Sequence, residues 1–306
     1  MTTALFTHDS AAGHATPPDH PEQIARYGAV MDALQGLSLD RRVAPLAADD
    51  DVLRCHPAHY LAALRDGAPA QGVRMLDADT WQSPGSLEAA LRAVGGACAA
   101  VDAVLAGEVG RAFVAMRPPG HHAEHETAMG FCLFGTVAIA AKRALDHHGL
   151  SRVAVLDFDV HHGNGTQDLL WDDARAFFAS SHQMPLYPGS GAASEVGAHG
   201  QMMNVPLPAG SDGVLARREW RAILDRAATH RPELVLISAG FDAHGDDPLA
   251  ALDWDETDFA ALTRDICDMA TDCGAPVVSV LEGGYDLQAL GRSVRAHVET
   301  LMEAAG

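Results

Sequence analysis

The sequence predicts an α/β protein with an open, mostly parallel, doubly wound sheet flanked by helices, and two observations support this. From residue 112 onward, short apolar runs rich in β-branched residues alternate with longer helical segments. Such alternation is typical of parallel sheets, whose right-handed crossovers place helices on both faces. In addition, no low-complexity linker or internal repeat divides the 306 residues. We therefore expect residues 1–306 to form one domain.

The N-terminal third predicts helices with little obvious chemistry. Apart from the short apolar run Ala4–Phe6, residues 1–20 have a loop-like composition rich in His and Pro. Pro21-Glu22 then predicts a helix start, because proline suits the first helical turn. The expected elements are a helix over 21–37, a helical hairpin over 50–65 and a long Ala-rich helix over 86–105.

From residue 112 onward, the sequence predicts alternating strands and helices. The expected strands are 112–116, 153–158, 176–180, 234–239 and 277–281. The expected helices are 134–147, 165–171, 213–230, 255–272 and 287–303. Residues 185–213 are rich in Gly and Pro and are expected to form a loop.

Four polar clusters each follow one of these strands. They are His121-His122, Asp157 to His162, Gly240 to Asp242, and Glu282 to Tyr285. In an open parallel sheet, ligands bind outside the carboxyl ends of the strands. The sequence therefore predicts an active site where these four loops meet at that edge.

The stretch from Val153 to Gly165 carries the strongest signal for a metal. An apolar run gives way to Asp157, Asp159 and His161, which face one way if the extended conformation persists. Carboxylates placed together repel each other, and a divalent cation removes that conflict. We predict Asp159, His161 and Asp242 as ligands. Three protein ligands leave an open position, as in catalytic zinc sites, and Fe²⁺, Mn²⁺ and Co²⁺ also suit an oxygen-rich set.

His121 and His122 follow Arg117-Pro118-Pro119-Gly120, a loop stiffened by its prolines. Asp157 and Asn164 are candidate partners that would set the histidine tautomers, so that one imidazole acts as general base and later as acid. Tyr285, after two glycines, could donate a hydrogen bond to a developing oxyanion. A dinucleotide turn at 163–168 is disfavoured, because the third glycine is missing and nearby aspartates would repel a pyrophosphate.

The amino-acid composition limits the kinds of partner that the protein is expected to bind. The formal net charge is −20, from 41 acidic and 21 basic residues, which argues against broad contact with nucleic acid and favours a cationic substrate. Five cysteines without Cys-x-x-Cys spacing indicate neither a disulfide framework nor a thiolate zinc site. No apolar run could span a bilayer and no signal peptide is evident, so we expect a soluble, cytoplasmic protein without a membrane partner. A single lysine among many arginines indicates a GC-rich bacterial genome.

Together these motifs resemble the zinc-dependent histone deacetylase-like family of the arginase/deacetylase superfamily, and its class II-like bacterial amidohydrolase branch in particular. Asn164 stands where the class I pattern has an acid. The resemblance extends from His20-Pro21-Glu22 to Tyr285. Its most specific motifs are Arg117-Pro118-Pro119-Gly120-His121-His122, Gly130-Phe131-Cys132, Asp157-Phe158-Asp159-Val160-His161-His162-Gly163-Asn164-Gly165-Thr166, Tyr187-Pro188-Gly189-Ser190-Gly191, Asn204-Val205-Pro206-Leu207, Ser238-Ala239-Gly240-Phe241-Asp242 and Glu282-Gly283-Gly284-Tyr285.

The resemblance implies a role for each matching residue. Zinc would bind Asp159, His161 and Asp242. His121 and His122 would be the acid/base pair, supported by Asp157 and Asn164, and Tyr285 would polarise the acyl carbonyl. A channel for an acyl-lysine side chain would be lined by Gly130, Phe131, Tyr187, Leu249 and Gly284, and a structural K⁺ would use Asp157, Asp159, His161 and Ser180. Asp79 is the loosest match, to a rim acid that holds the substrate backbone.

The expected activity is metal-dependent removal of acyl groups from N-acyl-lysine or similar N-acyl amines. The substrate could be an acylated lysine peptide or a small acylated amine. The alternatives are an acylpolyamine or other small-amide deacetylase, and a catalytically weak acyl-lysine binding module. Leu249 disfavours the polyamine alternative, because polyamine-specific relatives carry an acid there. An arginase-like two-metal site would need Asp at the positions of Gly163 and His244, so one metal is expected. The sequence leaves a homo-oligomer open.

Overall fold

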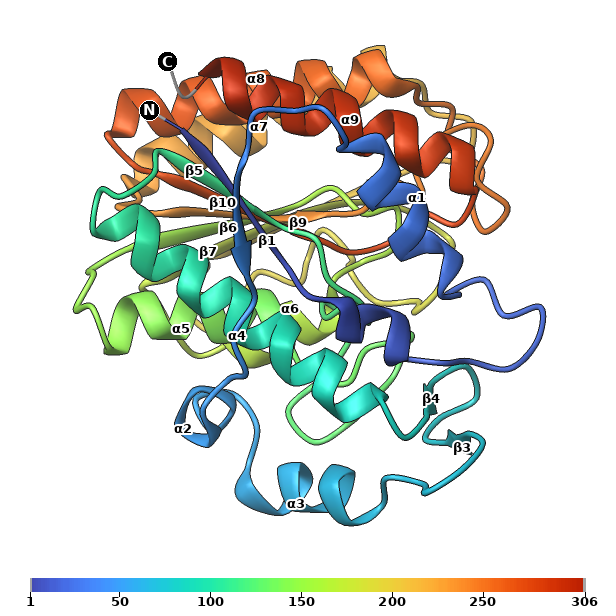
Figure 1. The fold of residues 1–306 in the computed structure, drawn as a ribbon. Helices are drawn as coiled ribbons and strands as arrows, with labels where there is room; N and C mark the ends of the chain where they lie inside the picture. Colours follow the sequence, from blue (N-terminus) through green and yellow to red (C-terminus); the bar gives the residue numbers. More distant parts are fainter. Residues whose placement is uncertain (1, 305–306) are drawn as a thin grey trace.

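The computed structural model describes residues 2–304, and at its centre lies one eight-stranded sheet (Figure 1). The strand order is β2-β1-β5-β10-β9-β6-β7-β8, and every neighbouring pair is parallel. The bounds are β1 Thr3–Thr7, β2 Asp40–Val43, β5 Arg111–Val114, β6 Val153–Asp157, β7 Ala176–Gln183, β8 Met202–Leu207, β9 Val235–Ala239 and β10 Val277–Leu281. The predicted open, parallel sheet is confirmed.

Helices cover both faces of the sheet (Figure 1). One face carries α1 (Ala25–Ala33), α7 (Gly213–His230), α8 (Glu256–Cys273) and α9 (Leu287–Ala304). The other carries α4 (Ser86–Leu105), α5 (Thr136–Asp146) and α6 (Asn164–Leu170). Smaller elements complete the N-terminal half: η1 (Asp9–Gly13), α2 (Asp49–Val52), α3 (Ala58–Asp66) and the hairpin of β3 (Arg74–Met75) and β4 (Trp81–Gln82).

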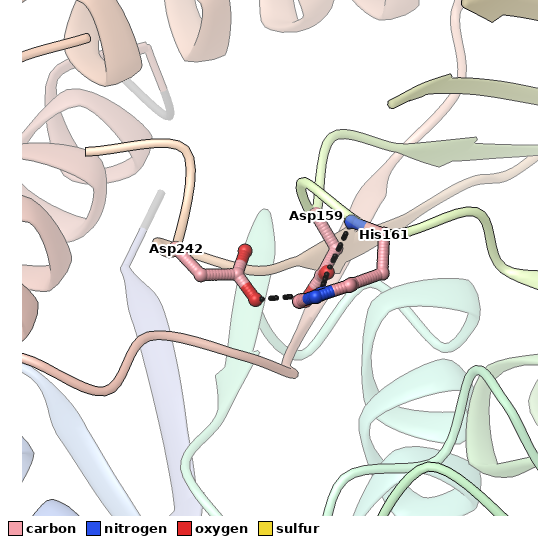
Figure 2. A group of neighbouring side chains, drawn as sticks. All are labelled: Asp159, His161 and Asp242. Atoms are coloured by element: carbon pink, nitrogen blue, oxygen red, sulfur yellow. Dashed lines mark hydrogen bonds and ion pairs between the residues drawn. The ribbon is translucent and has the colours of Figure 1, made fainter. Parts of the chain in front are cut away.

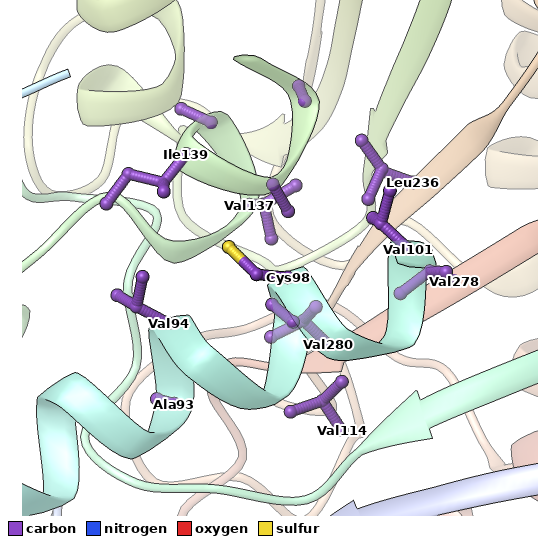
Figure 3. Packing of buried hydrophobic residues seen from close by; sticks show 14 of the residues in the cluster. Ala93, Val94, Cys98, Val101, Val114, Val137, Ile139, Leu236, Val278 and Val280 are labelled. Atoms are coloured by element: carbon purple, nitrogen blue, oxygen red, sulfur yellow. The ribbon is translucent and has the colours of Figure 1, made fainter. Parts of the chain in front are cut away.

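Each face of the sheet has its own apolar core. On the α4 face, Cys98 and Val101 pack close to Val137 and the strand residues Val114 and Val280 (Figure 3). The opposite core contains large aromatic side chains, among them Phe113, Phe158, Trp220, Phe241 and Phe259. All five cysteines are unpaired and four are buried, so they serve as small apolar side chains, as their spacing indicated.

Three strands of the eight-stranded sheet lie in segments that the sequence did not predict as strands, and neither strand of the small β3–β4 hairpin was predicted. β8 falls inside the expected loop 185–213, and the loop prediction is wrong there. It contains Pro206, which an edge strand tolerates because one side of its backbone needs no partner. β2, at the opposite edge, is the charged sequence Asp40–Val43, which has no apolar run. β1 is the short apolar run near the N-terminus, and it lies between β2 and β5.

The four polar clusters follow four neighbouring central strands. β5, β10, β9 and β6 lie side by side in the sheet, and each cluster lies at or beyond the carboxyl end of its strand. Loops from distant parts of the sequence therefore meet at one edge, as the strand-end rule predicts. Within residues 2–304, no helix is both long and apolar enough to cross a membrane.

Candidate active site

Asp159, His161 and Asp242 form a compact group of metal-ligating side chains (Figure 2). One ligand atom from each lies within 4.8 Å of the others, and all three residues are buried. His161 Nδ1 is 3.2 Å from Asp159 Oδ1 and 3.2 Å from Asp242 Oδ2. Two carboxylates and one imidazole thus converge on one point. No other such group is found in the part of the chain that the structure describes.

The chain reaches this arrangement by turning rather than by continuing β6. The extended conformation does not persist to His161, because β6 ends at Asp157, one residue before the predicted end of the strand. Each aspartate then accepts a hydrogen bond from the backbone two residues later. Asp157 Oδ1 accepts from the Asp159 N–H at 3.1 Å, and Asp159 Oδ1 accepts from the His161 N–H at 2.9 Å. The other carboxylate oxygen of Asp157, Oδ2, lies 3.0 Å from His121 Nδ1.

The charges of the three side chains favour a cation. Burial opposes ionisation of Asp159, but His121 and His161 outweigh it and hold its pKa well below the ordinary value. Burial, together with Asp159, raises the pKa of Asp242. Burial also opposes protonation of His161, yet Asp159 and Asp242 raise its pKa to about 10. A proton on His161 thus supplies positive charge at the place where a divalent metal would supply it, so these residues fit a metal.

Two glycines permit the close packing around these groups. A Cβ atom on Gly283 would collide with Asp242 Oδ2, and one on Gly163 would collide with Asp157 Oδ2. Gly163 therefore leaves no room for the aspartate of a two-metal site. His244 is likewise an imidazole and not a carboxylate, and its Nδ1 accepts the Asp246 N–H at 2.9 Å. Both observations favour one metal.

His121 and His122 lie beside the three ligands, with ring centroids 4.0 Å apart. His121 Nδ1 is 3.0 Å from Asp157 Oδ2, whereas His122 Nδ1 is 2.7 Å from Asn164 Oδ1. Burial opposes protonation of His121, but the carboxylates of Asp159 and Asp157 raise its pKa well above the ordinary value. Burial and the neighbouring His121 lower the pKa of His122 well below it. The paired histidines thus have opposite protonation tendencies, and Asp157 and Asn164 contact them as the sequence suggested.

Tyr285 lies in the segment that follows β10 and is 8% exposed. Its ring is 5.7 Å from that of Phe131, and the Arg26 guanidinium lies 4.9 Å from its centroid. Its backbone N–H donates to Asp247 Oδ2 at 2.7 Å. Burial raises the pKa of the Tyr285 phenol well above its ordinary value, so the hydroxyl keeps its proton and can donate a hydrogen bond.

A cavity of about 210 Å³ leads to these groups. Its lining consists of Asp79, His122, Gly130, Phe131, His161, Leu186, Tyr187, Leu249 and Tyr285. Four of the five predicted wall residues are among them. Gly284 is not among them, and its carbonyl oxygen accepts a hydrogen bond from the buried Arg26 Nε at 2.6 Å. A larger hollow of about 670 Å³, lined by residues such as Arg54 and Lys142, includes neither the ligands nor the histidine pair.

The predicted potassium residues are also neighbours. Asp157 and Ser180 are paired in register across β6 and β7. Ser180 Oγ lies 2.9 Å from His182 Nδ1. The K⁺ site stays a prediction.

Two supporting residues, Glu282 and Glu22, lie in motifs named from the sequence but were given no role there. Glu282 Oε2 accepts the backbone N–H groups of Gly120 and His121, at 2.6 and 3.1 Å. Glu22 is fully buried and pairs with Arg26 and Arg117. The signal for Glu282 was available, because an acid directly after an apolar strand is unusual. Glu22 gave no comparable signal, since its partner Arg117 is distant in sequence.

Comparison with known proteins identifies the class to which this fold and site belong. The histone deacetylase domain model matches residues 20–301, so the chain belongs to the histone deacetylase family. It is accordingly a metal-dependent deacetylase.

Individual relatives support the assignment to this family. The chain is 42% identical to the histone deacetylase-like amidohydrolase of Pseudomonas aeruginosa, over 90% of this chain and 73% of that protein. It is 36% identical to histone deacetylase 14, chloroplastic, of Arabidopsis thaliana, over 97% of this chain and 76% of that protein. Among solved structures, the HDA15 HD domain superposes with a TM-score of 0.93 at 30% identity, covering 99% of this chain and 89% of that one.

Proposed function

We propose that the protein is a zinc-dependent deacetylase that removes acetyl or other short acyl groups from N-acyl-lysine side chains or similar N-acyl amines. One observation carries this proposal. The cavity is bordered by Phe131 and Tyr187 and reaches His122, His161 and Tyr285 at its inner end. Aromatic walls suit the methylene stem of an acyl-lysine, while the polar inner end suits its amide.

The ligand set supports the proposed metal. Asp159, His161 and Asp242 would hold a single Zn²⁺, with Fe²⁺, Co²⁺ or Mn²⁺ as alternative occupants. When bound, such an ion supplies a Lewis acid and lowers the pKa of water. Predicted K⁺ at Asp157, Asp159, His161 and Ser180 would have a structural role.

The protein's own residues would handle the protons and the acyl oxygen. His122 lines the cavity and His121 does not, which favours His122 as the base that takes a proton from water. The same imidazole would return the proton to the departing amine. His121, paired with Asp157, would remain positively charged beside it. Tyr285 would donate its hydroxyl proton in a hydrogen bond to the acyl oxygen as negative charge develops there.

The whole chain, residues 1–306, would act as one catalytic domain, because the family match and the sheet both extend along nearly all of it. A cytoplasmic location, a bacterial source and the absence of nucleic-acid partners stay predictions.

Turnover measurements test the proposal. The zinc-loaded protein should deacetylate a fluorogenic acetyl-lysine peptide, and kcat/KM should be compared with that for acetylated diamines. We expect the peptide to be preferred and metal analysis to give one bound zinc per chain. Preference for the diamine would favour the acylpolyamine alternative. Binding of the peptide without turnover of either substrate would indicate a binding module and contradict the proposal.

A further inference from the structure

Glu124 lies two residues beyond His122 and reaches the same asparagine from the other side. Asn164 Oδ1 is 2.7 Å from His122 Nδ1, and Asn164 Nδ2 donates to Glu124 Oε1 at 2.6 Å. Asn164 is buried, whereas Glu124 is half-buried. A carboxylate, a carboxamide and an imidazole are therefore connected in one line that ends at the cavity.

The order of these groups matters because a carboxamide has two unlike ends. Its oxygen only accepts hydrogen bonds and its NH₂ group only donates them. A carboxylate only accepts, so Glu124 requires the NH₂ end of Asn164. The oxygen must then face His122, whose Nδ1 must carry the proton. His122 Nε2 is left without a proton, as a base requires.

His121 provides the contrast within the same loop. Its partner, Asp157, is a carboxylate that accepts through either oxygen, so no third residue is needed to orient it. An asparagine in the equivalent place beside His122 can rotate by half a turn and offer NH₂ instead. Asn164 Nδ2 also contacts Met129 Sδ at 3.4 Å. A thioether sulfur is a weak acceptor and therefore a poor substitute for a carboxylate.

Glu124 is also held in position. Its backbone N–H donates to Thr127 O at 3.0 Å, and the Thr127 N–H donates back to Glu124 O at 3.3 Å. This tight turn directs the side chain towards Asn164 rather than leaving it free in a flexible loop. Glu126, two residues further, instead points to surface histidines and is 53% exposed.

We propose that Glu124 is a positioning residue of the deacetylase reaction, which fixes the carboxamide of Asn164 and thereby the tautomer of His122. The proposal rests on the function proposed above for His122. Within that function it adds a residue that touches neither substrate nor metal and acts through Asn164.

Kinetics of single variants give the first test. Glu124→Ala should lower kcat about tenfold with little change in KM, because one hydrogen bond to a charged group is lost behind the base. Glu124→Gln should stay within about threefold of wild type, since a Gln oxygen can still accept from Asn164. Glu126→Ala is the matched control, because it removes a carboxylate from the same loop, and it should leave kcat unchanged. A wild-type kcat in Glu124→Ala would overturn the proposal.

A double substitution gives a sharper test, because the effect of Glu124→Gln on kcat should change sign when residue 164 is an aspartate. In Asn164→Asp a second carboxylate would face Glu124 at hydrogen-bond distance, and the two would repel each other. Adding Glu124→Gln to Asn164→Asp should therefore raise kcat by about tenfold, although the same change lowers it slightly beside Asn164. A purely structural role for Glu124 predicts no such reversal, and its absence would overturn the proposal.

The tautomer can be measured without turnover. In full-length protein labelled with ¹⁵N-histidine, with and without zinc, the His122 signals should show the proton on Nδ1. Glu124→Ala should introduce the Nε2–H form, and an unchanged tautomer in that variant would contradict the positioning role. If the wild type fails to deacetylate acetyl-lysine, the proposed function falls, while this measurement still decides what Glu124 does.

Discussion

The site has a floor and walls, and they are built differently. The floor consists of Asp159, His161 and Asp242, which are buried at the ends of β6 and β9. The walls are Phe131, Tyr187 and Leu249, which lie on loops, and Tyr187 is 37% exposed. In the proposed reaction, residues at strand ends would carry the chemistry, while loop residues would control which substrate reaches them. Changes in the floor should abolish activity, and changes in the walls should alter selectivity.

Backbone N–H groups hold the two carboxylates of the floor in place. Asp159 Oδ2 accepts the Gly283 N–H at 2.9 Å, and Asp242 Oδ1 accepts the Val160 N–H at 2.9 Å. Each donor belongs to a turn at a different strand end, so the sheet itself orients both carboxylates. On the walls, by contrast, the Phe131 N–H donates to the side chain Thr80 Oγ1 at 3.0 Å, within a contact between two loops.

The largest effect is expected from loss of the metal. A chelator, or Asp242→Ala, should lower kcat/KM by at least about 10³-fold, because a metal contributes several kcal/mol to such reactions. Zinc or cobalt should restore the chelated wild type but not the variant. Asp246→Asn, four residues further and exposed, is the control and should keep its activity. Activity that is indifferent to chelators would contradict a metal mechanism.

Tyr285→Phe comes next, because Tyr285 lines the same cavity as the walls but is assigned a role in the chemistry. It should lower kcat on acetyl-lysine by at least about 10²-fold with little change in KM, because an oxyanion donor acts mainly in the transition state. Tyr27→Phe, whose hydroxyl is 3.0 Å from Thr7 Oγ1, is the matched control. Unchanged turnover in Tyr285→Phe would exclude the assigned role.

A third prediction concerns His297. Its ring packs against Phe158 and Phe241, the residues that precede Asp159 and Asp242 in the sequence. Burial lowers the pKa of His297 to about 3, so it is neutral in the folded protein. The unfolded chain binds this proton below its ordinary pKa of 6.5, so stability is full above pH 6.5 and decreases as the pH falls towards 3. At pH 5 the loss should be about 2 kcal/mol.

Urea unfolding at pH 7.5 and pH 5 measures this loss. His297→Gln should reduce the pH dependence by about the same 2 kcal/mol, because glutamine can keep a hydrogen bond to Thr263 or Ser279 without titrating. An identical pH dependence in both proteins would show that His297 does not titrate on unfolding.

The floor was also easier to predict from sequence than its supports. Strand-end placement alone brought together the ligands and the histidine pair, because apolar strands and the polar residues after them are visible in the sequence. β2 and β8 were missed, since edge strands are stabilised by pairing and need no apolar run. Glu124 was missed because its role depends on the rotation of Asn164, which no local pattern encodes. Gly284 was placed on the wall by family resemblance, but it is not among the residues that line the cavity.

The smallest effect is expected at the walls. Leu249 is half-buried at the cavity, where polyamine-specific relatives carry an acid, and its N–H donates to Asp247 Oδ1 at 3.0 Å. Leu249→Glu should shift the ratio of kcat/KM for acetylated diamine over acetyl-lysine peptide by about threefold to fivefold towards the diamine, because an exposed charge pair contributes only up to about 1 kcal/mol. Leu249→Gln separates charge from size and should leave the ratio near its wild-type value. If both variants shift the ratio equally, the charge is irrelevant. The wall would then select by shape alone.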